Sequence, residues 1–172
     1  MIIPLNLYIK DFLSFKEETI VFNQNETTCV MGRNLTEDAQ DSNGSGKSAL
    51  QSAIEFTYTG SISRKINKSK IVRRGCKEAV IVHEAFNTIK QEYLRIERII
   101  PFKGSELILI HLFPDHCEFE FDKDKYKVSI ATTNDANKWI EKYVGIDKSD
   151  LSNYFFPNEL TYTSFFNLSD TK

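Results

Sequence analysis

One glycine-containing stretch indicates the fold class of this chain: Gly32-Arg-Asn-Leu-Thr-Glu-Asp-Ala-Gln-Asp-Ser-Asn-Gly-Ser-Gly-Lys-Ser48. It follows the short apolar run 27–31, which is predicted to form a strand ending at Gly32. From Lys47 onward, apolar and aromatic residues recur with helical spacing as far as Gly60. A strand, a glycine-containing loop and a helix, in that order, are the context that a phosphate-binding P-loop requires.

The chemistry of this loop predicts ATP and Mg²⁺ as ligands. Glycines let successive backbone amides turn toward phosphate oxygens, and a helix N-terminus adds donors and a favourable dipole. Lys47 is predicted to reach the outer phosphates, where it would act on the reacting group, and Ser48 to place its hydroxyl on the magnesium ion. The alternative is that Gly44-Ser-Gly46 is only a helix-start turn. The residues predicted to contact nucleotide are Arg33, Asn34, Asn43, Gly44, Ser45, Gly46, Lys47, Ser48 and Ala49.

The loop departs from the strict GxxxxGK(S/T) spacing, which puts Asp41 where the first glycine belongs. Either Asp41 replaces that glycine, or the loop starts at Gly32-Arg-Asn34 and residues 35–43 are an insertion. We favour the insertion, because Gly32 directly follows the apolar run and acidic side chains in the loop would repel a triphosphate. These acids are Glu37, Asp38 and Asp41.

The composition is that of one soluble folded domain. The chain has 172 residues, of which 41% are hydrophobic and 27% charged, with a net charge of -2. This balance argues against a surface that coats nucleic acid everywhere, but it permits a local basic patch. The cysteines are far apart and form no CxxC pair, which indicates a reducing cytoplasm. No stretch approaches the roughly 18 apolar residues of a membrane span.

The remaining pattern predicts an α/β fold with a P-loop core, an antiparallel β subdomain at about 79–130 and C-terminal helices at about 133–156. The first helix after the sheet is expected to start near Thr133, with Asn134 and Asp135 as further capping candidates, and to end before Gly145. A second short helix is expected to start at Asp147. The predicted strands are 5–9, 19–22, 27–31, 79–86, 92–100, 106–113, 117–121 and 125–130.

Basic side chains crowd the segment that follows the first helix. A solvated basic loop is the default interpretation, and the alternatives are contact with DNA phosphates or a clamp on the nucleotide. The six residues are Arg64, Lys65, Lys68, Lys70, Arg73 and Arg74.

With these motifs in place, the chain resembles the N-terminal ATP-binding lobe of the SMC and SbcC-like ATPases, the Rad-type ABC machines of double-strand-break repair and chromosome maintenance. The resemblance covers essentially all of residues 1–172, in the order of the family's motifs. Its signs are Lys10-Asp-Phe-Leu-Ser-Phe15, Asn43 to Ser48, Thr59-Gly60, Ile71-Val-Arg-Arg-Gly75, Tyr93-Leu-Arg-Ile-Glu-Arg98, Val144-Gly-Ile-Asp147 and Phe155-Phe-Pro-Asn158.

The resemblance implies roles for two more residues. A glutamine of the family's Q-loop reaches the magnesium ion and the attacking water, and here Asn158, or alternatively Glu159, stands at the matching position. A simple turn after Pro157 is the competing interpretation of this segment. Ser14 falls in a segment that packs near the adenine in relatives.

The resemblance also implies partners. The chain would be one lobe of an ABC-type head, ending before a coiled coil, and ATP hydrolysis would require the C-terminal lobe of the same ATPase. Two heads would pair as a homodimer on ATP binding and engage double-stranded DNA, with an SbcD-like nuclease as a further partner and a nucleoid-associated location when bound to DNA. The competing hypotheses are a RecF-like regulatory or defence-type module that acts through partner recognition, and a stand-alone P-loop kinase.

Overall fold

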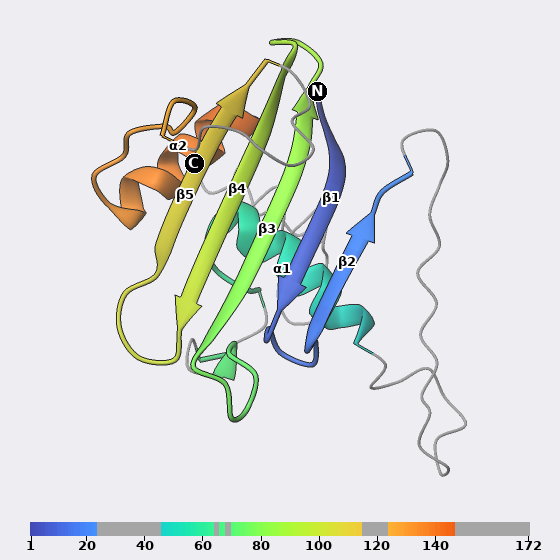
Figure 1. Cartoon of the computed structure of the whole chain (residues 1–172), viewed down its shortest axis with the longest axis vertical. Coiled ribbons are helices and arrows are strands. Elements are labelled where there is room, and N and C mark those ends of the chain that lie inside the picture. Colours follow the sequence, from blue (N-terminus) through green and yellow to red (C-terminus); the bar gives the residue numbers. More distant parts are fainter. Residues whose placement is uncertain (24–45, 64–65, 68–69, 115–123, 147–172) are drawn as a thin grey trace, which may run out of the picture.

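A five-stranded antiparallel sheet with strand order β2-β1-β3-β4-β5 forms the body of the molecule (Figure 1). The computed structural model describes residues 1–23, 46–63, 66–67, 70–114 and 124–146. The strands are β1 (Ile2–Lys10), β2 (Glu17–Val21), β3 (Glu78–Asn87), β4 (Glu92–Pro101) and β5 (Leu107–Phe113), and the helices are α1 (Lys47–Thr59) and α2 (Thr133–Val144).

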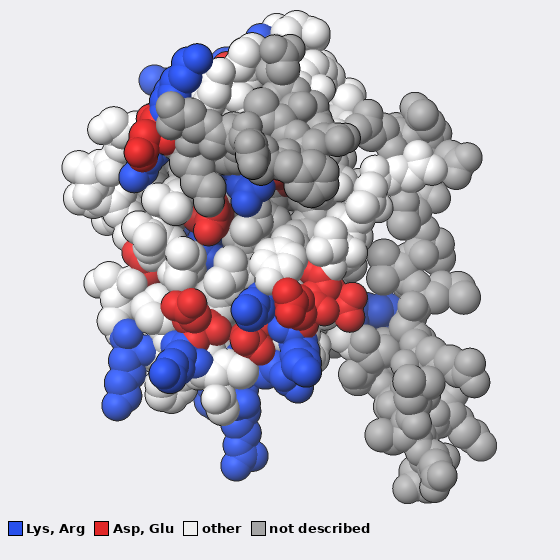
Figure 2. Space-filling view, viewed as in Figure 1, with Lys and Arg blue, Asp and Glu red and all other residues white. Residues whose placement is uncertain are grey.

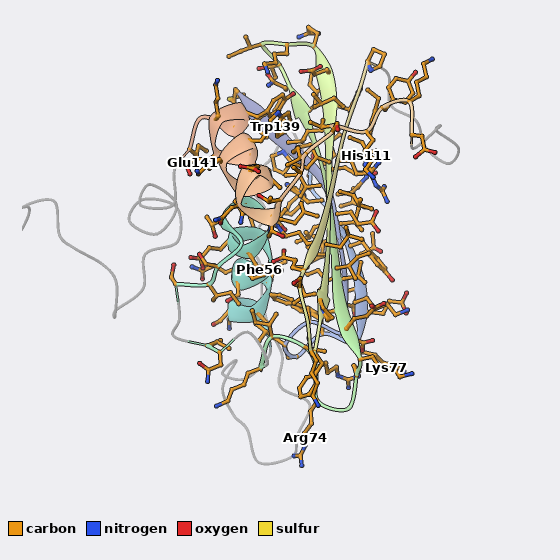
Figure 3. The ribbon with its side chains drawn as sticks, turned by 90° about the vertical axis from the view of Figure 1, so that its left-hand side faces the viewer. Phe56, Arg74, Lys77, His111, Trp139 and Glu141 are labelled. Atoms are coloured by element: carbon orange, nitrogen blue, oxygen red, sulfur yellow. The ribbon has the colours of Figure 1, made fainter. Side chains whose placement is uncertain are left out.

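Both helices cover the same face of this sheet, so the described part of the chain has two layers. Seen edge-on in Figure 3, α1 and α2 stand on one side of the strands, and Phe56 of α1 lies at the layer boundary. We call the opposite face, which carries the cross-strand row Tyr8, Val82 and Glu97, the open face. The predicted α/β class is confirmed.

Strand alternation explains which side chains meet the helices. Leu7 and Ile9 of β1 point to the helix face, and Ile9 stands opposite Ile81 of β3 in the antiparallel register. Together with Leu50 and Phe56 of α1 they form the main hydrophobic core, in which each side chain is almost completely buried. A second core cluster joins α2 to strands β4 and β5.

The sheet differs from the prediction in its extent. Strands β1 and β2 belong to it as well, so the antiparallel layer is not confined to about 79–130. Residues 125–130, predicted to be a strand, form none: 124–126 turn, and the segment then pairs with β5 through an isolated bridge between Lys127 and His111. The strands predicted at 27–31 and 117–121 and the helix predicted from Asp147 lie outside the described residues.

The helix boundaries follow from their caps. Helix α1 spans Lys47–Thr59 as predicted and ends at Gly60, whose left-handed φ of 66° lets its amide bond to the Phe56 carbonyl. Helix α2 starts at Thr133, but its cap is Thr132, one residue before the predicted candidates, because the Thr132 hydroxyl accepts from the Asp135 amide at 3.1 Å. Gly145 ends α2 as predicted.

Arg98 of β4 is completely buried between the sheet and both helices. Its Nε donates to the Thr57 carbonyl of α1, its Nη1 to Glu106 Oε1, and its Nη2 to Asn137 Oδ1 of α2, each at 2.7 Å. Burial lowers the pKa of Arg98, and the neighbouring Glu106 carboxylate opposes that shift. One side chain therefore ties α1, α2 and the segment before β5 to the sheet.

His83 of β3 links α1 to β1 through a second buried polar contact. Its Nδ1 lies 2.8 Å from the Asn6 carbonyl and its Nε2 lies 2.7 Å from the Tyr58 hydroxyl. A carbonyl only accepts, so Nδ1 carries the proton and Nε2 accepts from Tyr58. Burial lowers the pKa of His83 to about 4, which keeps the ring neutral at pH 7.

Candidate functional site

The N-terminus of α1 begins with a glycine, a lysine and a serine. Gly46 precedes the helix with a left-handed φ of 89° and supplies no side-chain cap, and the first turn of the helix carries no acidic residue. Lys47 and Ser48 are half-buried in that first turn, and Ala49 behind them is buried. The positive end of the helix dipole and the Lys47 ammonium therefore lie at the same end of α1.

The loop after β1 lies directly against this helix start. Asp11 and Leu13 both have φ of 49°, a left-handed conformation that non-glycine residues rarely adopt. The Asp11 amide bonds to the Lys16 carbonyl at 2.8 Å, which closes the loop. As a result Ser14 Oγ would lie only 3.2 Å from a Cβ atom added to Gly46.

A third segment, the turn at 70–76, is joined to the same loop. The Leu13 amide donates to the Ile71 carbonyl and the Arg73 amide to the Asp11 carbonyl, both at 2.7 Å. The Arg73 guanidinium lies 4.0 Å from the Asp11 carboxylate. A hydrogen bond to Asp11 raises the pKa of the Cys76 thiol, so this cysteine is held in its protonated, weakly nucleophilic form.

The structure brings together those predicted site residues that it describes. Ser14 lies beside Gly46, and Lys47, Ser48 and Ala49 continue from it into α1. Lys70, Arg73 and Arg74 belong to the turn that is bonded to the Ser14 loop. The other predicted residues lie outside the described ranges: Arg33, Asn34, the 35–43 insertion, Asn43, Gly44, Ser45, Arg64, Lys65, Lys68, Asn158 and Glu159.

A cleft of about 540 Å³ opens at this end of the sheet, and its aromatic wall was not predicted. Phe102 follows β4, and its amide donates to the Lys77 carbonyl at 2.8 Å, which brings the β4–β5 hairpin to the 70–76 turn. The sequence signals the hairpin through Lys103-Gly104, but the approach of Phe102 to the turn depends on strand pairing. The described lining residues are Leu13, Lys70, Val72, Arg74, Gly75 and Phe102.

The contact between Gly46 and Ser14 predicts an unequal cost for two glycine substitutions. Gly46 and Gly75 have nearly the same φ, 89° and 90°, but only Gly46 has neighbours within 4 Å of an added Cβ. We expect Gly75→Ala to lower the free energy of unfolding by about 1 kcal/mol through backbone strain, and Gly46→Ala to lower it further. Urea denaturation measures both losses. Adding Ser14→Ala to Gly46→Ala should recover the extra loss of stability, because it removes the hydroxyl that an added Cβ would meet. Equal losses would contradict the close approach.

Within the described ranges, no three His, Cys, Asp or Glu side chains gather in a way that could hold a metal ion. No helix in that part of the chain has the length and apolar character needed to cross a membrane.

Comparison with known proteins identifies the family. A family model described as an AAA domain matches residues 6–171. No curated protein matches the chain.

Among solved structures, the recombination mediator protein RecF with ATP is similar at 16% identity and a TM-score of 0.47, over 75% of this chain and 28% of that one. RecF with ATPrS is similar at 17% identity and a TM-score of 0.46, over 68% of this chain and 28% of that one. The chain thus spans about 28% of the length of these RecF chains. Since the family model covers nearly the whole sequence, the chain belongs to the AAA domain family, and its α/β fold is that of a P-loop NTPase.

Proposed function

We propose that this chain binds ATP with Mg²⁺ at the N-terminus of α1. The observation that carries the proposal is the helix start itself, where an uncapped, acid-free first turn presents Lys47 and Ser48 directly after a left-handed Gly46. Glycine is favoured at this place because its φ is left-handed and because an added Cβ would lie only 3.2 Å from Ser14 Oγ. Membership of the AAA domain family makes ATP the expected nucleotide.

The residues present fit a magnesium nucleotide. Mg²⁺ retains several waters and is usually held by one or two protein oxygens together with substrate phosphates. The Ser48 hydroxyl would supply one such oxygen, and the Ser52 hydroxyl donates to the Ser48 carbonyl at 2.8 Å, one turn along the helix. Bound Mg²⁺ would offset phosphate charge, while Lys47 would contact the outer phosphates.

Lys47→Ala is expected to weaken ATP binding by about 10- to 150-fold, because a charge-assisted hydrogen bond contributes roughly 1.5–3 kcal/mol. Isothermal titration calorimetry with Mg-ATP measures the change. Lys138→Ala, at an exposed lysine on α2, is the matched control and should bind ATP normally. ATP affinity unchanged in Lys47→Ala would contradict the proposal.

For the whole protein we propose an SMC- or SbcC-like ATPase that acts on DNA, in which this chain forms the N-terminal lobe of a head. The order of motifs along the sequence supports this. ATP hydrolysis would then require the C-terminal lobe, with Asn158 or Glu159 in the Q-loop role. An SbcD-like nuclease would join the assembly.

Head pairing tests this wider proposal. With the C-terminal lobe supplied, Mg-ATP should convert the protein to a dimer of heads, and double-stranded DNA should increase the dimeric fraction. Light scattering after size exclusion measures both. ATP binding without any pairing would instead favour the RecF-like regulatory module that acts through other partners.

A further inference from the structure

The cleft beside Phe102 combines an aromatic surface with positive charge. Phe102 is a large hydrophobic side chain with 50% of its surface exposed, although it follows a strand whose neighbouring residues are half-buried or buried. Lys70 and Arg74 line the same cleft, and no ion pair holds either of them within the described residues. The volume of about 540 Å³ lies inside the range of roughly 300–1,000 Å³ that is usual for ligand pockets.

The floor of the cleft is apolar, and its position is fixed by hydrogen bonds. Leu13 and Val72 contribute apolar surface, and Val72 is bridged to Phe12 of the loop after β1. The bond from the Phe102 amide to the Lys77 carbonyl holds the aromatic wall against the turn that carries Arg74. Backbone contacts therefore hold together the three segments that line the cleft.

More cations surround this end of the molecule. Lys77 and Lys103 are the sequence neighbours of the turn and of Phe102, and Figure 3 shows Arg74 and Lys77 at the same end of the sheet, with Arg74 extending away from the ribbon. Figure 2 shows several Lys or Arg side chains projecting from this lower end of the open face, with Asp or Glu side chains directly above and between them. Asp11 and the exposed Glu78 are carboxylates at this same end, and Asp11 is engaged with Arg73. An anionic ligand would thus meet positive charge on approach.

We propose that this cleft binds an unpaired nucleobase of single-stranded DNA, with the base stacked on Phe102 and the flanking phosphates on Lys70 and Arg74. The proposal rests on the wider proposed function, which brings the protein to DNA, and adds the kind of strand that it contacts here. Stacking on an exposed aromatic ring in a positively charged groove is the usual way in which proteins bind single strands without sequence preference.

The chemistry of the cleft favours a single strand over a duplex. A duplex would place its phosphates on the cations but leave Phe102 in water, because its bases are stacked on each other. An unpaired base is planar and apolar on its faces, so it covers Phe102, Leu13 and Val72 while its own phosphates remain at the cationic rim.

Fluorescence anisotropy with a labelled oligothymidylate tests the proposal. Phe102→Ala should weaken binding at least about tenfold, and Phe102→Tyr should retain it. Leu107→Ala is the matched control, because Leu107 is also 50% exposed but does not line the cleft, and it should bind normally. Arg74→Gln should reduce the slope of log affinity against log salt by about 0.7. Unchanged oligothymidylate affinity in Phe102→Ala would overturn the proposal.

Two altered ligands separate the contribution of the bases to binding from that of the phosphates. A spacer oligonucleotide that keeps the phosphates but lacks bases should bind the unaltered protein as weakly as oligothymidylate binds Phe102→Ala. The duplex of oligothymidylate with oligoadenylate should bind Phe102→Ala as tightly as it binds the unaltered protein. Equal binding of the spacer and base-containing strands would also overturn the proposal.

ATP distinguishes this cleft from the nucleotide site. Lys47→Ala should lose ATP affinity and keep oligothymidylate affinity, so the two proposals fail independently. If ATP competes with the oligonucleotide and Phe102→Ala weakens ATP to the same degree, the cleft takes the base of the bound nucleotide, and the single-strand proposal is wrong.

Discussion

Replacing Arg98 with alanine is expected to lower the free energy of unfolding by about 3–5 kcal/mol, because the change leaves a buried partner charge uncompensated. The side chains of Arg98 and Glu106 are 0% and 2% exposed, and their ion pair at 2.7 Å lies between the sheet and α2. The substitution also removes the donors to the Thr57 carbonyl and to Asn137. Urea denaturation followed by circular dichroism measures the loss.

Arg95→Ala is the matched control for this prediction. Arg95 stands on the same strand but on the open face, where its side chain is 23% exposed and pairs with Glu84. Its loss should cost far less, about 1 kcal/mol, because water replaces part of the interaction. Combining Arg98→Met with Glu106→Leu should recover part of the stability, since an apolar pair leaves no buried charge. Similar losses for Arg95→Ala and Arg98→Ala would contradict the central position of Arg98.

The protein is expected to lose about 3 kcal/mol of stability through His83 alone as the pH falls from 6.5 to 4. The folded-state pKa of His83 is about 4, below the usual 6.5, so the unfolded chain takes up a proton over this range and the folded protein does not. The contribution of His83 is therefore complete above pH 6.5 and is lost as the pH falls toward 4. Denaturation midpoints measured across this range give the slope.

Two substitutions separate this titration from that of the carboxyl groups. His83→Phe should reduce the slope of stability against pH by up to about 1.4 kcal/mol per pH unit between pH 6.5 and 4, whatever its cost at pH 7. Tyr58→Phe removes the hydroxyl that donates to His83 but leaves the ring able to titrate, so it should lower stability and keep most of the slope. A slope unchanged in His83→Phe would show that this ring is not buried in its neutral form.

Hydrophobic periodicity and turn-forming residues predicted much of the architecture. Helix α1 and its end at Gly60 followed from helical spacing and a terminal glycine, and β3 to β5 followed from apolar alternation between turn residues. These signals are local, so they can be read directly from sequence. The addition of β1 to the edge of β3 depends on pairing across about 80 residues, as in Ile2 opposite Asn87, and no local pattern encodes it.

Part of the site was predictable for the same reason. Gly46, Lys47 and Ser48 are contiguous, and their chemistry depends on residue type and spacing. The place of Phe102 in the cleft could not be predicted, because it depends on a hydrogen bond from the Phe102 amide to the Lys77 carbonyl, which is 25 positions away. Arg98 was visible only as part of a strand motif, since its burial follows from the register that places it opposite Ile81 on the helix face.

The most direct test of ATP binding at the start of α1 is a heteronuclear NMR titration of the isotopically labelled chain with Mg-ATP. ATP binding at this helix start predicts the largest amide shifts at Gly46, Lys47 and Ser48, with Ser14 next, because that loop lies against Gly46. Amides of α2, such as that of Ile140, should move little. Shifts concentrated elsewhere, or none at saturating Mg-ATP, would contradict ATP binding at the start of α1.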